Sequence, residues 1–240
     1  MKKIVFLIIL LQLSSSQAQI VDTTKVNLAI TSKLTNKKFI LPVSLIVAGT
    51  LLRKSKINQE VYNYRNRNFY KFYDKTDDFL QYAPIALSYS GNLLGFKSKN
   101  SYNQMIINQL VSNIINTGTV FALKETFKDY RPDNTGRNSF PSGHTTTSFN
   151  NATLHFLEYK DSNLWFAYSG YLFASTTGIF RVLNNRHYLS DITAGAGLGI
   201  ATAIIVHNWN PFKVNRNSNV IPYPYMSDNS YGLGLVYNFK

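Results

Sequence analysis

The chain has 240 residues, of which 45% are hydrophobic, enough for one domain with a single core. It contains no cysteine, which excludes a disulfide framework and a thiolate metal site. Lys and Arg number 25 against 12 Asp and Glu, and the formal net charge of +13 favours anionic partners such as phosphate groups, acidic lipid headgroups or nucleic acid.

The first 18 residues have the parts of a secretory signal. Lys2 and Lys3 precede an apolar run of about ten residues, and the small residues Ser16 and Ala18 favour cleavage after Ala18. An uncleaved membrane helix is the alternative, although the run is shorter than the roughly 20 residues that span a bilayer. We therefore expect a signal peptide over residues 1–18 and export to the periplasm of a bacterial cell envelope. No nucleic-acid partner is expected there.

Six segments of the main body have the length and composition of helices. They are residues 39–52, 78–96, 102–130, 142–159, 164–183 and 189–209. Few stretches before residue 210 alternate with a period of two, so the predicted fold class is all-α, a bundle of about six core helices. In the last helix, Gly195, Gly197 and Gly199 are expected to allow close packing against a neighbour.

The apolar segments leave membrane insertion open. Residues 164–180 and 192–206 are the best candidates for spans, whereas residues 39–52 have the length of a buried or interfacial helix. The segment 102–130 carries six Asn and Gln residues, which we interpret as too polar for contact with lipid. We expect a bundle that associates with a membrane surface.

The C-terminal stretch changes character. Pro211, Pro222 and Pro224 break helices, and residues 230–240 alternate apolar with small or polar side chains, as a β-strand does. We interpret residues 210–240 as a tail that covers the bundle.

A histidine and an aspartate four residues apart, His187 and Asp191, follow Arg181. The four-residue offset brings both side chains to one helical face, or places them across a helix N-terminus. An aspartate bonded to one ring nitrogen fixes the tautomer and leaves the other nitrogen's lone pair free to attack. A structural salt link is the alternative, so the pair indicates a covalent histidine nucleophile only in combination with the arginine.

A second block runs Pro141-Ser142-Gly143-His144. Ser142 is predicted to be a helix N-cap, and Gly143 lets the backbone approach an anion without a Cβ in the way. The free N–H groups of a helix start bind phosphate, which would put His144 beside the bound group as a general acid. An ordinary helix start with a surface histidine is the alternative.

Lys124, Arg131 and Arg181 supply positive charge. In phosphoryl transfer, three equatorial oxygens carry the transition-state charge, and catalysis is mostly positioning plus electrostatic stabilisation. Lys124 and Arg131 are seven residues apart, which predicts one face of one helix that ends at Pro132. Arg137, in the connection to the second block, is interpreted as solvated.

The three blocks follow one another in a fixed order. They are Lys124-x6-Arg131-Pro132, Pro141-Ser142-Gly143-His144 and Arg181-x5-His187-x3-Asp191. In this pattern the chain resembles the type 2 phosphatidic acid phosphatase family, which also includes bacterial acid phosphatases and vanadium-dependent haloperoxidases. The family has a serine before the arginine of the third block, where this chain has Phe180.

The resemblance implies a phosphatase domain over residues 39–209, preceded by an N-terminal segment over residues 19–38. It implies that His187 is the nucleophile, that Asp191 orients it, and that His144 is the acid for the leaving group and later the base for water. The implied phosphate-binding residues are Lys124, Arg131, Ser142, Gly143 and Arg181. No metal ion and no other cofactor is implied.

The leading prediction is a metal-independent phosphatase that hydrolyses phosphate mono- or diphosphates, of membrane lipids by expectation, through a phosphohistidine intermediate. Its expected partners are a phosphorylated lipid or a small phosphate ester and a membrane surface. Three alternatives stay open: a soluble, broad-specificity periplasmic acid phosphatase, a vanadate-dependent haloperoxidase, and a non-catalytic envelope protein with a degenerate pocket. Only Phe180 supports the last of these.

Overall fold

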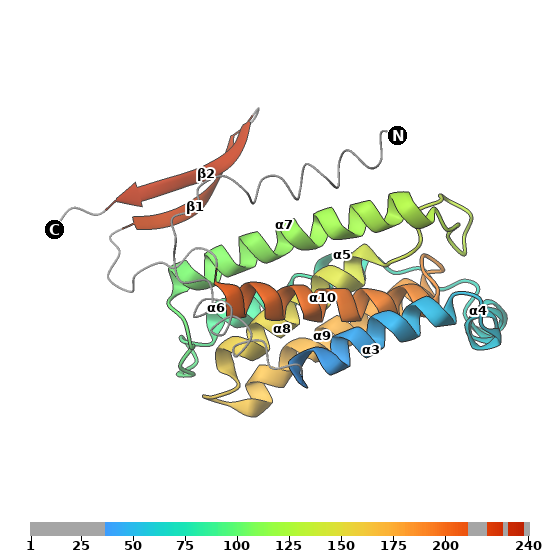
Figure 1. Ribbon diagram of the computed structural model, residues 1–240, viewed down its shortest axis with the longest axis horizontal. Helices are drawn as coiled ribbons and strands as arrows, with labels where there is room; N and C mark the ends of the chain where they lie inside the picture. Colours follow the sequence, from blue (N-terminus) through green and yellow to red (C-terminus); the bar gives the residue numbers. More distant parts are fainter. Residues whose placement is uncertain (1–36, 211–219, 228–229, 238–240) are drawn as a thin grey trace, which may run out of the picture. The chain divides into compact units, whose positions relative to one another are not determined.

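A computed structural model of the protein describes residues 37–210, 220–227 and 230–237. The predicted signal peptide, residues 1–18, and nearly all of the predicted N-terminal segment lie outside the described residues. The elements are α3 (Lys37–Leu52), α4 (Lys56–Asn68), α5 (Thr76–Leu80), α6 (Ala83–Ser90), α7 (Tyr102–Phe127), α8 (Gly143–Tyr159), α9 (Leu164–Leu183), α10 (Leu189–Trp209), β1 (Val220–Ser227) and β2 (Ser230–Tyr237) (Figure 1). The predicted all-α bundle is confirmed for the main body.

Most predicted helices are present, and α9 and α10 have the predicted bounds. The single helix predicted over residues 78–96 is wrong, because two short helices, α5 and α6, occupy its first part. Pro84 lies in the first turn of α6, where its missing N–H costs no intrahelical hydrogen bond, so it starts a new helix. The second helix ends before Gly95, which adopts a positive φ of 87°.

Helix α4, which carries Lys56, Arg65 and Arg67, was not among the predicted helices. The Ser55 side chain caps it by accepting a hydrogen bond from the Asn58 backbone N–H at 3.1 Å. The buried Arg65 guanidinium donates from Nε and Nη2 to the Leu183 carbonyl oxygen at 2.9 and 2.6 Å. Polar contacts of this kind, beside the aromatic contact of Tyr62 with Tyr188, hold α4 in place, and apolar periodicity alone did not reveal the helix.

Helix α10 packs between α3 and α8, and α8 in turn packs against α9 and α7. The predicted role of the α10 glycines is confirmed. A Cβ at Gly195 would lie 2.9 Å from the Ser142 carbonyl oxygen on the α8 side, and one at Gly197 would lie 2.6 Å from the Pro42 carbonyl oxygen in α3. Glycine thus lets α10 approach two neighbours at backbone distance.

Helix α7 directs its polar side chains inward. Gln109 Nε2 donates to Asn151 Oδ1 of α8 at 2.5 Å, and Ser112 Oγ donates to Asn150 Oδ1. The exposed large side chains of α7 include the apolar residues Ile114, Ile115 and Phe121. The interpretation of this segment as too polar for lipid contact is therefore wrong, because the composition of the whole helix does not describe its outer face.

By length and composition, α7 and α10 are the two helices in the described part of the chain that are able to cross a membrane. The apolar window of α10 is 67% buried, as in a core helix, whereas that of α7 is 28% buried. Helix α9, which contains the predicted candidate span 164–180, does not meet the same criterion. Its outer face nevertheless exposes Leu164, Trp165, Tyr168, Leu172 and Ile179.

The two strands pair antiparallel in a hairpin, with Val220 opposite Tyr237 and Ser227 opposite Ser230. The predicted strand near the C-terminus is confirmed over Ser230–Tyr237. Its partner β1 was not predicted; Pro222 and Pro224 were interpreted only as residues that break helices. Both strands of a two-stranded sheet are edge strands, where a residue without an N–H group is tolerated.

Replacing Gly199 by alanine is expected to destabilise the bundle by about 1–3 kcal/mol. The added Cβ would lie 2.3 Å from the Thr146 carbonyl oxygen and 2.7 Å from the Asn150 nitrogen, and both are backbone atoms of α8. The measurement is the thermal unfolding midpoint, followed by circular dichroism in detergent.

The matched control is Gly118→Ala in α7, where an added Cβ meets nothing within 4 Å. Alanine is favoured over glycine there by about 1 kcal/mol of helix propensity. A Gly199→Ala midpoint equal to or above that of the unmodified chain would show that α10 and α8 are not in close backbone contact.

Candidate active site

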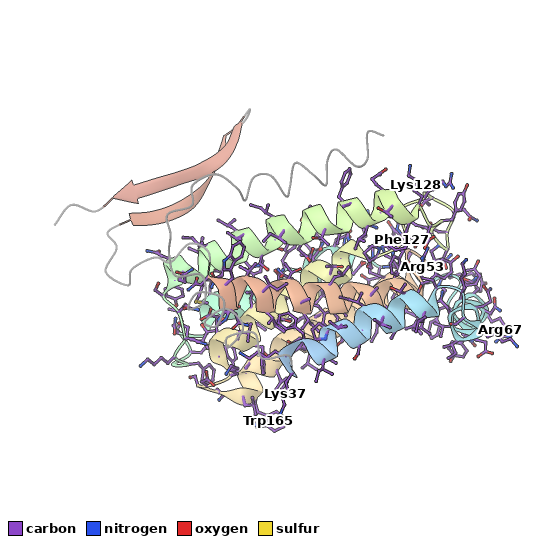
Figure 2. The ribbon with its side chains drawn as sticks, viewed as in Figure 1. Lys37, Arg53, Arg67, Phe127, Lys128 and Trp165 are labelled. Carbon is purple, nitrogen blue, oxygen red and sulfur yellow. The ribbon has the colours of Figure 1, made fainter. Side chains whose placement is uncertain are left out.

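The three sequence blocks meet at one end of the bundle. Figure 2 shows Arg53, Phe127 and Lys128 together at this end, with Lys37 and Trp165 at the other. Helices α3, α7 and α9 end here, and α8 and α10 begin here (Figure 1). The antiparallel packing of the helices therefore gathers residues that lie far apart in the sequence.

The carboxylate of Asp191 lies at the centre of this end, and its side chain is 1% exposed. Its Oδ2 atom accepts hydrogen bonds from Ser139 Oγ at 2.5 Å, from the Tyr188 backbone N–H at 3.0 Å and from His187 Nδ1 at 3.3 Å. Its Oδ1 atom accepts from Ser190 Oγ at 3.1 Å. Asp191 stands at the third position of α10, so the pair with His187 bridges the helix N-terminus, one of the two predicted arrangements.

The imidazole of His187 is 2% exposed. Burial, aided by the positive charges of Lys124 and Arg181 and opposed by Asp191, lowers its pKa from 6.5 to about 4. The ring is therefore neutral near pH 7. With the Nδ1 proton donated to Asp191, the Nε2 lone pair has no hydrogen-bond partner in the described part of the chain.

Helix α8 begins as the second block predicts. The Ser142 side chain is the N-cap and accepts from the Thr145 backbone N–H at 3.4 Å and from Thr145 Oγ1 at 3.0 Å. The Ser142 N–H donates to the Asp191 backbone oxygen at 3.1 Å, which ties α8 to α10. The first N–H groups of the helix, at Gly143 and His144, have no intrahelical acceptor and carry the positive end of the helix dipole.

Space for a Cβ exists at Gly143. The nearest atom that it would meet is Val120 Cγ1 at 3.7 Å, an ordinary contact distance. Among the described residues, no atom would clash with a Cβ at this position, so an anion has room to approach the backbone of Gly143.

Three cationic side chains surround the histidines. The buried Arg181 donates from Nη1 to Asp77 Oδ2 at 2.7 Å, while its Nε atom is buried with no acceptor among the described residues. Arg131 donates from Nε to Asn138 Oδ1 at 2.8 Å, and burial and the charges of Arg186 and Arg181 lower its pKa. Lys124 Nζ donates to the Asn138 and Ser139 carbonyl oxygens.

The arrangement of Lys124 and Arg131 differs from the prediction. They do not share one helix face, because α7 ends at Phe127 and Lys128 adopts a left-handed backbone with φ of 50°. Arg131 lies in the following loop, where its N–H donates to the Gly136 carbonyl oxygen at 2.9 Å. The loop, and not helical periodicity, brings the two cations to the same place.

A cleft of about 260 Å³ opens over these groups. It is lined by Tyr73, Asp74, Lys75, Asp77, Asp78, Arg131, His144, Arg181, Asn184 and Arg186. His144 is the histidine that lines it, and burial together with the charge of Arg181 lowers the pKa of His144. His187 is not among the residues that line this cleft; it lines a separate, smaller cavity with Pro132 and Tyr188.

Several residues of this site were not predicted. Ser139 supports Asp191, Asn138 holds two of the cations, and Arg186 lines the cleft while pairing with Asp133 at 3.0 Å. The carboxylates of Asp77 and Asp78 bind Arg181 and His144. No spacing rule connects α5 with the three blocks, so only the fold reveals these carboxylates.

Residues outside the predicted set lie as follows. Phe180 packs edge-to-face on Phe72, with ring centroids 5.6 Å apart, and contributes no hydroxyl group. Arg137 is exposed and lies over the Tyr130 ring at 4.8 Å. In the described ranges, no three His, Cys, Asp or Glu residues are grouped so that they could hold a metal ion.

Comparison with known proteins gives the family. Residues 105–215 match the model of the PAP2 superfamily, and this range includes all three blocks. The chain carries a PAP2 superfamily domain. The predicted resemblance is therefore confirmed.

The curated relatives of this PAP2 chain include two bacterial proteins. The lipid A 1-phosphatase of Porphyromonas gingivalis is 37% identical over 156 residues, which are 65% of this chain and 35% of that protein. The bacitracin transport permease protein BcrC of Bacillus licheniformis is 40% identical over 70 residues, 29% of this chain and 32% of that protein. The chain thus spans about a third of the length of the curated relatives that it matches.

Two solved structures are similar to the PAP2 chain. Aquifex aeolicus LpxE is 22% identical, covering 66% of this chain and 99% of that one, with a TM-score of 0.48. The first transmembrane PAP2 type phosphatidylglycerolphosphate phosphatase from Bacillus subtilis is 19% identical, covering 74% and 98%, with a TM-score of 0.44.

The PAP2 site is expected to bind inorganic phosphate, and Arg181→Lys is expected to weaken that binding roughly tenfold or more. Lysine has one charged nitrogen, so it cannot keep the bond to Asp77 and also supply the second donor that Nε provides. Isothermal titration calorimetry measures the dissociation constant. Arg67→Lys, at an exposed position of α4, is the control and should leave the constant unchanged. Equal phosphate affinity of Arg181→Lys and the unmodified chain would show that Arg181 does not bind the phosphate.

Proposed function

We propose that this protein is a membrane-associated phosphatase that hydrolyses phosphate mono- or diphosphates of lipids through a phosphohistidine on His187. The reaction needs no metal ion, because Lys124, Arg131 and Arg181 neutralise the phosphoryl oxygens. His144 is the general acid and base, and Asp191 orients the nucleophile. Ser142 and Gly143 position the phosphate at the start of α8.

One observation carries the proposal. Arg181 has a buried Nε–H without an acceptor, and the neighbouring His187 has a ring nitrogen, Nε2, with no hydrogen-bond partner among the described residues. An unsatisfied buried donor costs about 1–3 kcal/mol, more when it is charged. A phosphate group supplies both an acceptor for the guanidinium and an electrophilic phosphorus for the imidazole. Arg181 and His187 thus match the oxygen acceptor and the phosphorus atom of one phosphate group.

In the first step, the Nε2 lone pair of His187 forms a bond to phosphorus as the bond between phosphorus and the leaving oxygen breaks. His144 transfers a proton to that oxygen, and the lipid alcohol departs. The imidazole ring of His187 becomes cationic in this step, and the Asp191 carboxylate stabilises the charge through Nδ1–H. The cations stabilise the charge on the equatorial oxygens.

In the second step, a water oxygen attacks phosphorus from the side that the leaving group has vacated. His144, now neutral, takes a proton from this water while the N–P bond breaks and its electrons return to Nε2. Inorganic phosphate leaves, and both histidines regain their initial protonation states. A lipid diphosphate reacts in the same way, with a lipid monophosphate as the leaving group.

Two observations favour a lipid substrate. The curated relative with the longer match is named a lipid A 1-phosphatase, and the outer faces of α7 and α9 expose apolar side chains. The candidate site is at the end of the bundle where α7 and α9 end (Figure 1). A bundle held in a bilayer by such faces would present the site at headgroup level. Periplasmic orientation of this end is part of the proposal.

The test is phosphate release by detergent-purified protein, with and without chelator. The substrates are phosphatidic acid, phosphatidylglycerol phosphate, an isoprenyl diphosphate, lipid A, and soluble phosphomonoesters. We expect release from at least one lipid, unaffected by chelator, and none by His187→Ala. Acid quenching should trap alkali-stable phosphate on the unmodified chain alone.

Three results would count against parts of the proposal. Turnover of soluble esters only would favour the soluble acid phosphatase. Trapped phosphate on His187→Ala would rule out this histidine as the nucleophile. If the unmodified chain is inactive on every substrate, and its thermal unfolding transition shows that it is folded, the result would favour a non-catalytic envelope protein.

The pH dependence follows from the two histidines. His187 acts only when unprotonated, so its activity is lost as pH falls through its pKa of about 4. His144 acts only when protonated, so activity is lost as pH rises through its pKa, which lies below 6.5. The profile of kcat/KM is therefore expected to be a bell with an acidic optimum.

The matched comparison is the pH profile of His144→Ala on the same substrate. The substrate phosphate also titrates, but its effect on the rate is the same for both proteins and cancels in the ratio of their kcat/KM values. The ratio of unmodified to variant kcat/KM should fall as pH rises above the optimum. A ratio independent of pH would exclude His144 as the general acid.

A further inference from the structure

Helix α5 has five residues, and two of them carry adjacent carboxylates that bind different parts of the site. Asp77 Oδ2 accepts from Arg181 Nη1 at 2.7 Å. Asp78 Oδ1 lies 2.9 Å from His144 Nε2 and 3.7 Å from Arg181 Nη1. Both carboxylates line the cleft that His144 and Arg181 also line.

The two carboxylates differ in their surroundings. Asp77 is 1% exposed and also accepts from Asn184 Nδ2 at 3.2 Å, so it fixes the position of Arg181. The Asp78 side chain is 50% exposed. Within the described chain, His144 is its hydrogen-bond partner, with Arg181 at longer range. Asp78 therefore acts on the acid and Asp77 on the phosphate-binding arginine.

We propose that Asp78 is the positioning residue for the general acid, forming with His144 a second carboxylate–histidine pair in addition to Asp191 and His187. The inference rests on the proposed phosphatase function and deepens it. Because a carboxylate accepts, the His144 nitrogen that faces Asp78 carries a hydrogen. The other ring nitrogen, Nδ1, has no partner among the described residues and is the atom that exchanges a proton with the leaving oxygen.

The proton count closes without protonating Asp78. The Nδ1 proton of His144 moves to the leaving oxygen as the P–O bond breaks, and the neutral ring keeps its Nε2–H on Asp78. Water then returns one proton to Nδ1 while the N–P bond breaks. Asp78 stays ionised in both steps, as the aspartate of a catalytic triad does.

The electrostatic surroundings explain why such a partner is needed. Burial and the positive charge of Arg181 disfavour protonated His144, whereas the hydrogen bond and charge of Asp78, together with Asp77, favour it. The other charged groups of the cleft are Asp74, Lys75, Arg131 and Arg186. Without Asp78, the surrounding cations would leave the acid unprotonated over more of the working pH range.

A carboxylate beside a phosphate site also repels the substrate. A residue that merely shaped the cleft would therefore be better uncharged, and its removal would leave kcat unchanged. Asp78→Asn keeps the size of the side chain and removes the charge. We expect KM to fall or stay constant and kcat on an alkyl phosphate to fall about tenfold or more, since the acid loses its partner.

The decisive experiment compares two soluble or micellar substrates with different leaving groups, an alkyl phosphate and 4-nitrophenyl phosphate. The nitrophenolate departs without a proton, so Asp78→Asn should cost about tenfold on the alkyl ester and less than about threefold on the aryl ester. The alkaline limb of kcat/KM should move to lower pH. Asp78→Glu should recover part of the alkyl activity.

The control variant is Asp77→Asn, which acts through Arg181 and should raise KM for both esters by a similar factor. Equal losses on both esters in Asp78→Asn, or no loss on either, would overturn the positioning role while leaving the phosphatase function standing. An unmodified chain that releases phosphate from neither ester nor any lipid would overturn the function itself.

Discussion

One buried carboxylate organises this molecule. Asp191 accepts hydrogen bonds from Ser139, His187, Tyr188 and Ser190, and its backbone oxygen accepts from Ser142. A buried carboxylate is stable only when such donors replace water. Because these donors come from the loop before α8, the cap of α8 and the start of α10, none of the three segments can move without breaking a bond to Asp191. The same hydrogen bonds to Asp191 therefore hold the helix ends together and fix the geometry of the site.

The same burial sets the chemistry. A histidine beside an aspartate usually gains basicity, yet the pKa of His187 falls to about 4, because desolvation outweighs the carboxylate. The nearby charges of Lys124 and Arg181 act in the same direction. Under the proposed function, the cations that would stabilise phosphate thus act together with burial to keep the imidazole unprotonated.

The sequence predicted the parts of the structure that depend on local patterns. Helices α9 and α10 are long apolar runs, and the H-x3-D offset predicted that His187 and Asp191 lie either on one helical face or across a helix start, of which the second is found. Helix α4 was not predicted because polar groups such as Arg65 help to hold it in place. The break before α6 was not predicted because a proline such as Pro84 can begin a helix as well as end one. The partners Asp77, Asp78 and Ser139 depend on tertiary contacts, for which a single sequence has no signal.

The two-sided character of α7 shows why average composition misleads in such a bundle. Its amides, such as Gln109, form hydrogen bonds with α8, while its apolar residues, such as Phe121, lie on the outside. In a soluble helix the apolar face turns inward, so this reversal favours an apolar solvent around the bundle. Hydrogen bonds between helices then provide the specificity that burial of apolar surface provides in water. Under the proposed function, an amphiphilic substrate would lie along these outer faces with its phosphate at the end where Asp191 holds the helices together.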